Sequence, residues 1–269
     1  MMPKGLYGLA YNPFCKQADP QKVSFQSNDF QEMTNRLNFI KDARGIGLFT
    51  SPPGFGKTFA MRCFANSLNP NLYQMAYICL STVSLREFYR QFCVALNLEP
   101  SVHRSTMFRL IQERLYVLFK DKRRPFILAL DEAQEIDSRV LKDIKMIMNH
   151  DYDSLNCFTL LLIGEPHLNQ TLAKPVHEAL AQRITIHYNF SGLSADETHK
   201  YINHKISAAG GCPGILADAA ACAVHGFSNG NPRIIDNVMS DAFDIGEQAG
   251  KKTIDTDIIL SAVENQSFQ

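Results

Sequence analysis

The sequence lacks the segments that carry a protein into or across a membrane. No apolar run approaches the roughly 20 residues that a membrane-spanning helix requires. The first residues, MMPKGLYGLAYNPF, lack the basic and apolar regions of a secretory signal. With 269 residues, 45% of them hydrophobic, the chain can build one large domain or a domain with a smaller appendage. We therefore expect a cytoplasmic globular protein that does not bind a membrane.

Metal-ligand spacings, disulfide frameworks and internal repeats are also missing. The cysteines are odd in number, and none belongs to a C-x-x-C pair. Several fall in apolar stretches, where a free thiol packs as a small hydrophobe. We interpret all seven as reduced core residues: Cys15, Cys63, Cys79, Cys93, Cys157, Cys212 and Cys222. No nuclease, transposase or metal-hydrolase constellation is visible, so the work of the protein must be mechanical or regulatory.

Net charge is zero, but the charges are unevenly distributed along the chain. Residues 1–130 carry 17 Lys and Arg against 8 Asp and Glu, and the remainder carries 10 against 19. Such asymmetry is typical of a protein whose basic part binds nucleic acid, or whose basic face stacks on the acidic face of another copy. An incidental distribution of surface charge is the alternative interpretation.

The first two thirds of the chain alternate between strand and helix patterns. The strand segments are continuous apolar runs, as expected of parallel strands covered by helices on both faces. The expected strands cover 46–50, 72–80, 126–130, 158–163 and 184–188, and the helices between them cover 29–43, 57–67, 84–96, 105–120 and 138–149. We therefore predict an α/β core with a parallel five-stranded sheet flanked by helices.

The strand pattern ends after Leu193. Only helices are expected from there, at 194–209, 215–225, 232–248 and 255–265, with Gly210–Gly211 and Gly226 as helix stops. The predicted division is a core over residues 1–192, which includes an irregular N-terminal lead-in, followed by a small all-helical subdomain over 193–269.

The segment Ser51-Pro-Pro-Gly-Phe-Gly-Lys-Thr58 lies between an expected strand and an expected helix, the context in which a Walker A spelling forms a phosphate-binding loop. Gly54 and Gly56 let backbone N–H groups approach the phosphates of ATP. Lys57 is expected to reach the β- and γ-phosphates, and the Thr58 hydroxyl to ligate Mg²⁺. Ser51 replaces the usual first glycine, so we expect an altered turn without loss of binding. The predicted nucleotide contacts are Pro53, Gly54, Phe55, Gly56, Lys57, Thr58 and Phe59.

A second motif follows the apolar strand at 126–130, where Asp131 and Glu132 begin Asp-Glu-Ala-Gln. The carboxyl ends of strands are where an open parallel sheet exposes its ligand site. Asp131 is expected to hold Mg²⁺ through water, and Glu132 to orient and deprotonate the attacking water. An acid at the end of a buried strand is common, but together with the Walker A loop it predicts ATP hydrolysis.

Two arginines stand out because residues 131–269 contain only three. Arg183 and Arg233 both lie beside apolar segments, where a solvated surface role is less natural. Phosphoryl transfer needs extra positive charge, often donated by a neighbouring subunit. We predict that Arg183 is an arginine finger acting in trans and that Arg233 senses the nucleotide from the helical subdomain; structural salt bridges are the alternative.

These motifs resemble those of small bacterial AAA+ ATPases of the ExeA-like and TniB/MuB-like kind, which are related to origin-recognition ATPases. The matching stretches span nearly the whole chain: Gly8-Leu-Ala-Tyr-Asn-Pro-Phe14, the Walker A loop, Leu130-Asp-Glu-Ala-Gln134, Leu161-Leu-Ile-Gly-Glu-Pro166, Leu180-Ala-Gln-Arg-Ile184 and Gly230-Asn-Pro-Arg233. The resemblance implies a P-loop AAA+ core with a helical lid. It also implies a polar sensor 1 residue near the end of the strand at 158–163. Glu165 stands there, where an acid would repel γ-phosphate unless it is protonated or turned toward water or Mg²⁺. A loop carboxylate is the alternative interpretation.

Among these relatives, a free-standing module of this size is more similar to the accessory ATPases of DDE transposases than to the longer secretion ATPases. The resemblance implies an ATP-dependent homo-oligomer, ring or helical filament, that assembles on double-stranded DNA without sequence preference and regulates a transposase. An ExeA-like secretion or envelope-assembly ATPase is one alternative. A replication-initiator, helicase-loader or signalling ATPase is the other.

Candidate DNA contacts lie in the basic part of the chain. Binding through them would read phosphates rather than bases and would weaken with salt. The candidates are Arg86 and Arg90, spaced i, i+4 on one helix, and the cluster Lys120, Lys122, Arg123 and Arg124. Charge on the outer face of a helix is also normal in any soluble protein, so a solvated surface is the alternative interpretation.

Overall fold

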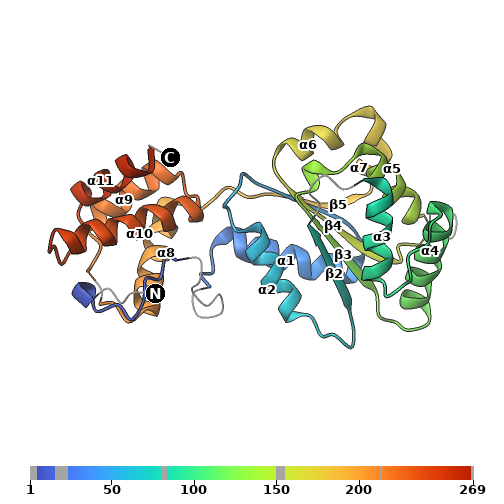
Figure 1. Cartoon of the computed structure of the whole chain (residues 1–269), viewed down its shortest axis with the longest axis horizontal. Coiled ribbons are helices and arrows are strands. Elements are labelled where there is room, and N and C mark those ends of the chain that lie inside the picture. Colours follow the sequence, from blue (N-terminus) through green and yellow to red (C-terminus); the bar gives the residue numbers. More distant parts are fainter. Residues whose placement is uncertain (1–4, 16–23, 80–83, 150–154, 213, 268–269) are drawn as a thin grey trace. The chain divides into compact units, whose positions relative to one another are not determined.

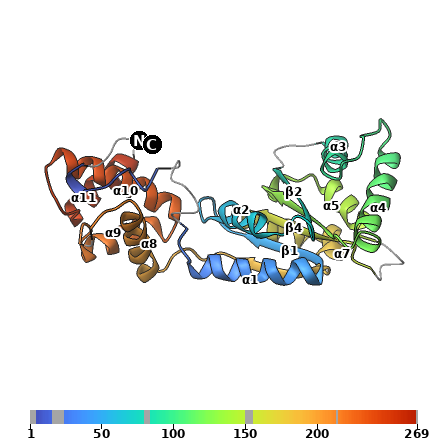
Figure 2. The same cartoon turned by 90° about the horizontal axis from the view of Figure 1, so that it is seen from below.

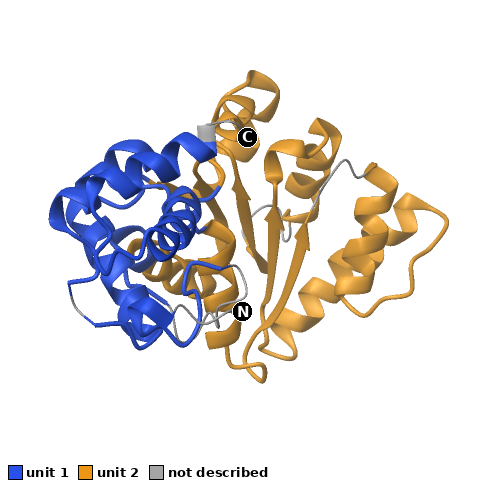
Figure 3. Ribbon diagram, turned by 60° about the vertical axis from the view of Figure 1, so that its left-hand side comes forward, with its two compact units in different colours: residues 1–31, 54–56, 191–269 blue, residues 32–53, 57–190 orange. Residues whose placement is uncertain are grey.

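The computed structural model describes residues 5–15, 24–79, 84–149, 155–212 and 214–267, which form two compact units (Figure 3). The α/β unit comprises residues 32–53 and 57–190. The helical unit comprises residues 1–31, 54–56 and 191–269. The boundary at 190/191 lies close to the predicted one, but the N-terminal lead-in groups with the helical unit and not with the core.

The α/β unit contains a five-stranded sheet in the order β2-β3-β4-β1-β5, and every neighbouring pair is parallel (Figure 1). Its strands are β1 (Gly45–Thr50), β2 (Gln74–Cys79), β3 (Phe126–Asp131), β4 (Phe158–Gly164) and β5 (Ile184–Asn189). All residues of β1, β3 and β4 are buried, which explains why these strands read as continuous apolar runs. The predicted parallel sheet is therefore confirmed.

Helices cover both faces of this sheet. Leu48, Leu128 and Leu160 share one buried cluster with α3, α4, α5 and α7, whereas α1 packs on the other face, where Ile40 lies against Gly47 (Figure 2). The helices are α1 (Asn28–Ala43), α2 (Lys57–Ser67), α3 (Leu85–Ala95), α4 (Arg104–Lys120), α5 (Ser138–Ile147), α6 (His167–Leu172) and α7 (Glu178–Ala181). The two shortest, α6 and α7, were not predicted, because one or two turns show no helical periodicity. The last residue of the strand expected at 72–80 lies outside the described residues.

The helical unit is built from α8 (Ala195–Ala208), α9 (Asp218–Ser228), α10 (Pro232–Gln248) and α11 (Thr256–Ser267). The lead-in, which includes a 3-10 turn at Gly5–Tyr7, fills part of its core. The Phe14 ring stacks on Phe243, and the Tyr7 hydroxyl donates to the Lys251 carbonyl at 2.8 Å. The lead-in belongs with these helices because its apolar side chains complete their core, which an irregular segment does not reveal in sequence.

One predicted helix stop is wrong. Gly226 lies inside α9, which continues to Ser228 and ends where Asn229 adopts a left-handed conformation at φ 48°. A Cβ at position 226 would meet nothing within 4 Å, so no steric contact requires a glycine at this position of the helix. Gly210, by contrast, follows α8 with φ +90° and acts as the predicted stop.

The cysteines and the membrane question can be examined over the described residues. All seven cysteines are free; Cys93 and Cys157 are buried, but Cys79, Cys212 and Cys222 are exposed, so the core interpretation is wrong for these three. Within the described ranges, no cluster of three or more His, Cys, Asp or Glu side chains could hold a metal ion. None of the helices in those ranges has the length and apolar character needed to cross a bilayer.

Candidate nucleotide-binding site

The Walker A loop follows β1 at the carboxyl edge of the sheet. Ser51 is buried, and its N–H donates to the Gly164 carbonyl of β4 at 3.2 Å. The Lys57 ammonium donates to the carbonyl oxygen of Ser51 at 2.7 Å and to its Oγ at 2.8 Å. Ser51 therefore does more than replace a glycine, because its hydroxyl helps to hold the Lys57 ammonium.

The tip of the loop, Gly54 to Gly56, groups with the helical unit. Both glycines have φ +90°, a conformation that L side chains rarely adopt. A Cβ on Gly54 would lie 2.5 Å from Asn231 Oδ1 and 2.9 Å from Arg233 Cβ. Asn231 caps α10 by accepting a hydrogen bond from the Arg233 N–H at 3.0 Å. The Gly-Asn-Pro-Arg segment thus lies against Gly54, and the role of Arg233 as a nucleotide sensor stays a prediction.

Thr58 and Asp131, which are 73 residues apart in sequence, meet at the carboxyl edge. The Thr58 hydroxyl donates to Asp131 Oδ2 at 2.9 Å, and the Glu132 N–H donates to Oδ1 at 2.9 Å. Asp131 is buried, with 3% of its surface exposed. A hydroxyl and a carboxylate this close are the hard oxygen donors that Mg²⁺ prefers, so the residues present fit the predicted metal.

A third side chain, Tyr77 of β2, reaches the same carboxylate. Its hydroxyl donates a short hydrogen bond to Asp131 Oδ2, the oxygen that also accepts from Thr58. Burial and the neighbouring Asp131 raise the pKa of the Tyr77 phenol well above its ordinary value. Sequence reasoning missed this residue, because a tyrosine in an apolar strand is usually a packing residue. Its proximity to Asp131 depends on the pairing of β2 with β3, which no sequence motif marks.

Glu132 stands at the turn after β3, in a left-handed conformation with φ 53° and ψ 39°. Backbone conformations of this kind are uncommon for residues other than glycine and concentrate at functional sites. One carboxylate oxygen, Oε2, accepts a hydrogen bond from Gln134 Nε2 at 2.6 Å. The Gln134 amide oxygen accepts from the Glu165 N–H at 3.0 Å. Gln134 was quoted as part of the motif but given no role in the sequence analysis.

Glu165, the residue at the sensor 1 position, turns its carboxylate toward His167, with Oε2 3.7 Å from Nδ1. A different polar group lies at the carboxyl edge of β1 and β5. Asn169 Nδ2 donates to Thr50 Oγ1 and to Asn189 Oδ1, both at 3.1 Å. Asn169 and Asn189 were also missed, because neither belongs to a recognisable spacing.

Arg183 lies at the opposite edge of the sheet from the Walker A loop. It directly precedes β5, which runs parallel to β1 with Ile184 beside Ile46. Ser51 is five residues further along β1, or about 16 Å at the usual rise of a strand. An arginine side chain in this position cannot span that distance to the phosphate-binding loop of its own chain. The site therefore brings together Lys57, Thr58, Asp131 and Glu132 but not Arg183.

The six DNA-contact candidates differ in how far their side chains are exposed to solvent. Arg86 and Arg90 are exposed on α3, whose other face buries Phe88 and Phe92, and Arg90 Nε lies 3.8 Å from Glu87 Oε2. Lys120, Lys122 and Arg123 are exposed. Arg124 is half-buried, and its Nε is buried without a hydrogen-bond partner among the described residues. Arg124 is thus less accessible than the other three members of its cluster, and all six residues stay predictions as DNA contacts.

The remaining nucleotide candidates flank the loop. Pro53 is exposed at the turn, and Phe55 belongs to the helical unit, where a Cβ on Gly192 would lie 2.8 Å from its ring. Phe59 lies in the first turn of α2, with the Arg62 guanidinium 5.7 Å from its ring centroid.

Comparisons with known proteins agree with this geometry. The model of the AAA domain family matches residues 40–172. General secretion pathway protein A of Aeromonas hydrophila is 30% identical over 262 residues, which cover 96% of this chain and 47% of that protein. The chain thus spans about half the length of this curated relative.

Solved structures of low sequence identity show the same fold. Cdc6p from Pyrobaculum aerophilum aligns with a TM-score of 0.68 at 13% identity, covering 94% of this chain and 70% of that chain. Aeropyrum pernix ORC1, solved in complex with DNA, aligns with a TM-score of 0.65 at 16% identity, covering 94% and 68%. Residues 40–172 thus match an AAA domain, and the order of the parallel strands together with these solved structures shows the P-loop AAA+ fold.

Proposed function

We propose that the chain binds Mg·ATP through its Walker A loop and hydrolyses it with Asp131 and Glu132. The observation that carries this proposal is the 2.9 Å contact between Thr58 Oγ1 and Asp131 Oδ2. These two oxygens would hold Mg²⁺, which neutralises phosphate charge when bound. Lys57 would bind the β- and γ-phosphates. The nucleotide would be surrounded by Pro53, Gly54, Phe55, Gly56 and Phe59, with Arg233 beside the phosphates.

Glu132 would accept the proton of the attacking water. Its carboxylate lies at the carboxyl edge, one residue after the metal-binding aspartate. Removing the proton as the oxygen approaches the γ-phosphorus is general base catalysis, which typically contributes 10²- to 10⁴-fold. The charge that develops on the phosphoryl oxygens requires a further cation.

Arg183 would supply that cation to the site of a neighbouring copy. Its position at the amino edge, about 16 Å along the strand from Ser51, rules out its own chain's loop and favours a head-to-tail contact. Under this proposal the chain would form ATP-dependent homo-oligomers, because the site around a nucleotide bound by one copy would be completed by the next. Such head-to-tail contacts close into rings or continue as helical filaments.

The process that this ATPase serves is proposed to be DNA transposition in the cytoplasm. The assembled copies would bind double-stranded DNA without sequence preference and regulate a DDE transposase. Support comes from the excess of basic residues in positions 1–130 and from the exposure of Arg86, Arg90, Lys120, Lys122 and Arg123. Contacts of this kind neutralise phosphates and release counterions, so binding would weaken steeply with salt.

A second candidate is a role in secretion or envelope assembly. It is favoured by the 30% identity with General secretion pathway protein A across nearly the whole of this chain. This candidate requires a protein partner at a membrane and no dependence on DNA, whereas the first requires duplex DNA and no membrane.

The two candidates are separated by the anisotropy of a labelled duplex titrated with the protein in ATP, in ADP and without nucleotide, at two salt concentrations. Electron microscopy of the same samples would show any rings or filaments. Tight, salt-sensitive binding in only one nucleotide state supports the transposition proposal. No binding in any state overturns it and leaves the secretion candidate.

Charge variants make this test specific. Replacing Arg86 and Arg90 with alanine should weaken binding and flatten its salt dependence. The matched control replaces Lys200 and Lys251, two exposed lysines of the helical unit that pair with acids four residues away. Equal losses in both double variants would mean that net charge alone drives binding, which contradicts a DNA surface on α3.

A further inference from the structure

The side chain of Gln134 forms a two-ended bridge behind the carboxyl edge of the sheet. Its Nε2 donates to Glu132 Oε2 at 2.6 Å, and its Oε1 accepts from the Glu165 N–H at 3.0 Å. The direction of the amide follows from its neighbours, because a carboxylate needs a donor and a backbone N–H needs an acceptor. A flipped amide would place its oxygen against the Glu132 carboxylate and its NH₂ group against the Glu165 N–H. The bridge therefore joins the turn after β3 to the turn after β4.

Neighbouring residues leave space for this bridge and fix its position. A Cβ on Gly164, the last residue of β4, would lie 2.7 Å from Gln134 Oε1 and 3.3 Å from the Gln134 backbone nitrogen. A side chain at position 164 would thus displace the amide. Glu132 is held from its other side as well, because its carbonyl accepts the Glu135 N–H at 2.9 Å and closes the 3-10 turn Ala133–Glu135.

We propose that Gln134 is a positioning residue for ATP hydrolysis. By holding Oε2 of Glu132, it leaves Oε1 to accept the proton of the attacking water. The water oxygen then bonds to the γ-phosphorus while the bond from that phosphorus to the β,γ-bridging oxygen breaks, and the electron pair leaves with ADP. This inference rests on the proposed role of Glu132 as the general base, and it extends that role to the residue that aims it.

The same geometry gives Glu165 a role through its backbone N–H, and not the sensor 1 role of its side chain that its position suggests. Its backbone N–H anchors the far end of Gln134, while its own carboxylate lies toward His167. A polar side chain that links the end of β4 to the catalytic glutamate is present, but it belongs to Gln134. Changing the Glu165 side chain should therefore have little effect, because any residue except proline supplies the N–H.

The test compares Gln134→Leu, Gln134→Glu and Glu165→Gln with the parent protein. Leucine keeps the approximate size and loses both bonds, whereas glutamate keeps an acceptor for the Glu165 N–H but has no donor for Glu132. We expect kcat to fall at least tenfold in both Gln134 variants, with the Kd for ATP, measured by titration, within about twofold. Glu165→Gln should stay within about twofold of the parent in both quantities.

A second readout does not depend on turnover. Amide hydrogen exchange at Glu165, followed by NMR, should speed up in Gln134→Leu, which removes the acceptor, and stay slow in Gln134→Glu. Unchanged exchange in Gln134→Leu would show that the bridge does not exist in solution and would overturn the inference.

The outcomes separate this inference from the proposed function. If Glu132→Gln hydrolyses ATP normally, Glu132 is not the base and the proposed mechanism fails. If Glu132→Gln is inactive while Gln134→Leu keeps the parental kcat, only the positioning role fails. Loss of ATP affinity in step with kcat in Gln134→Leu would mean a general structural defect and also overturns the inference. A loss in Glu165→Gln equal to that in Gln134→Leu would assign the role to the Glu165 carboxylate instead.

Discussion

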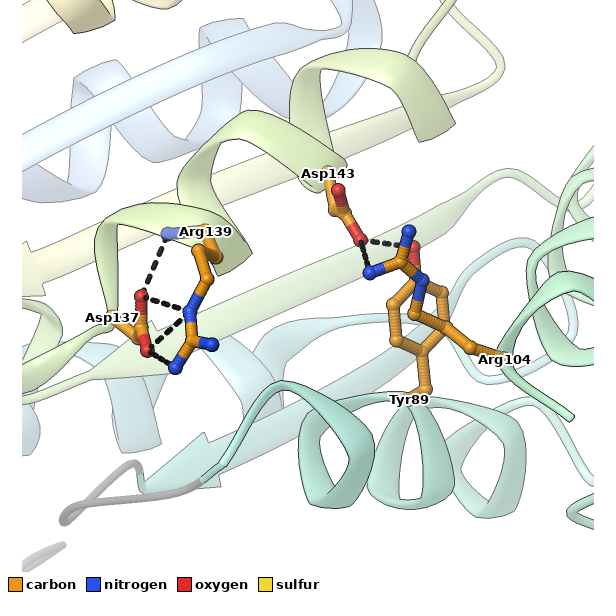
Figure 4. A network of polar contacts seen from close by, with 5 residues as sticks. All are labelled: Tyr89, Arg104, Asp137, Arg139 and Asp143. Carbon is orange, nitrogen blue, oxygen red and sulfur yellow. Dashed lines mark hydrogen bonds and ion pairs between the residues drawn. The ribbon is translucent and has the colours of Figure 1, made fainter. Parts of the chain in front are cut away.

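A buried polar contact between α3 and α5 allows a quantitative prediction of stability. The Tyr89 hydroxyl donates to Asp143 Oδ2 at 2.8 Å, and both residues are buried, with 1% and 6% of their surfaces exposed. Arg104 of α4 also approaches Oδ2, but at 3.8 Å and with 56% of its side chain in solvent. Figure 4 shows this trio and a second acid–arginine pair, Asp137 and Arg139, at the N-terminal end of α5.

Tyr89→Phe removes the hydroxyl and leaves the ring, so no large cavity forms and the cost is electrostatic. A hydrogen bond to a charged group is worth about 1.5–3 kcal/mol, and the unpaired acceptor remains buried. Arg104 replaces little of this because solvent screens its charge. We expect the free energy of unfolding to fall by about 2 kcal/mol, and the melting temperature by roughly 4–8 °C for a unit of this size.

Urea denaturation followed by circular dichroism, with calorimetry as a second probe, measures this loss. Arg139→Ala is the matched control: its guanidinium lies 2.6 Å from Asp137, closer than Arg104 lies to Asp143, but its side chain is 72% exposed. We expect no measurable change in that variant, since exposed ion pairs contribute little. A loss below about 0.5 kcal/mol in Tyr89→Phe, against the charge-assisted range given above, or an equal loss in Arg139→Ala, would refute the argument that burial decides the strength of these contacts.

Four further predictions follow from the site and the core. Lys57→Ala should abolish ATP binding in a nucleotide titration, and normal affinity would end the Walker A assignment. Glu132→Gln should trap the assembled form in size-exclusion and subunit-exchange assays; faster exchange would contradict it. Tyr77→Phe should lower the Mg²⁺ concentration needed for half-maximal ATP hydrolysis by roughly fivefold, since Asp131 loses a competing hydrogen bond worth about 1 kcal/mol. A higher Mg²⁺ concentration for half-maximal hydrolysis would show that the tyrosine assists metal binding. Burial raises the pKa of Tyr7 to about 12, whereas the phenol of the unfolded chain ionises near pH 10. The free energy of unfolding should therefore fall between pH 10 and 12 in the parent and less steeply in Tyr7→Phe. Identical alkaline melting curves of the two proteins would contradict this prediction.

The sheet and the positive φ angles of the glycine loop could be predicted because their physical causes are local. Strands buried on both faces must be apolar throughout, and β1, β3 and β4 are buried at every residue. A phosphate-binding loop needs glycines with positive φ before a helix, and Gly54 and Gly56 have φ +90°. Such requirements appear as short, contiguous spellings in the sequence.

The missed features depend on contacts between distant segments. Tyr77 reaches Asp131 only because β2 lies beside β3, and Phe14 enters the helical core through its stacking on Phe243. Gln134 belongs to the motif, but the motif does not show its hydrogen bonds. They join it to the Glu132 carboxylate, two residues earlier, and to the Glu165 N–H, 31 residues later. No periodicity or composition reveals such contacts, because they are set by the tertiary arrangement of the elements.

Sheet order also changes how the uneven charge of the chain should be understood. Because all five strands are parallel, Asp131, Glu132 and Glu165 follow strands at the carboxyl edge. Arg44 and Arg183 directly precede β1 and β5 at the amino edge, and Arg124 lies two residues before β3. The Nε atoms of Arg44 and Arg124 are buried without a hydrogen-bond partner among the described residues. The charge asymmetry therefore runs along the strands as well as between the two parts of the sequence. Two copies stacked with the amino edge of one on the carboxyl edge of the next would bring opposite charges together, whereas a face-to-face pair of carboxyl edges would place acids against acids. This polarity favours the head-to-tail assembly that a trans-acting Arg183 requires.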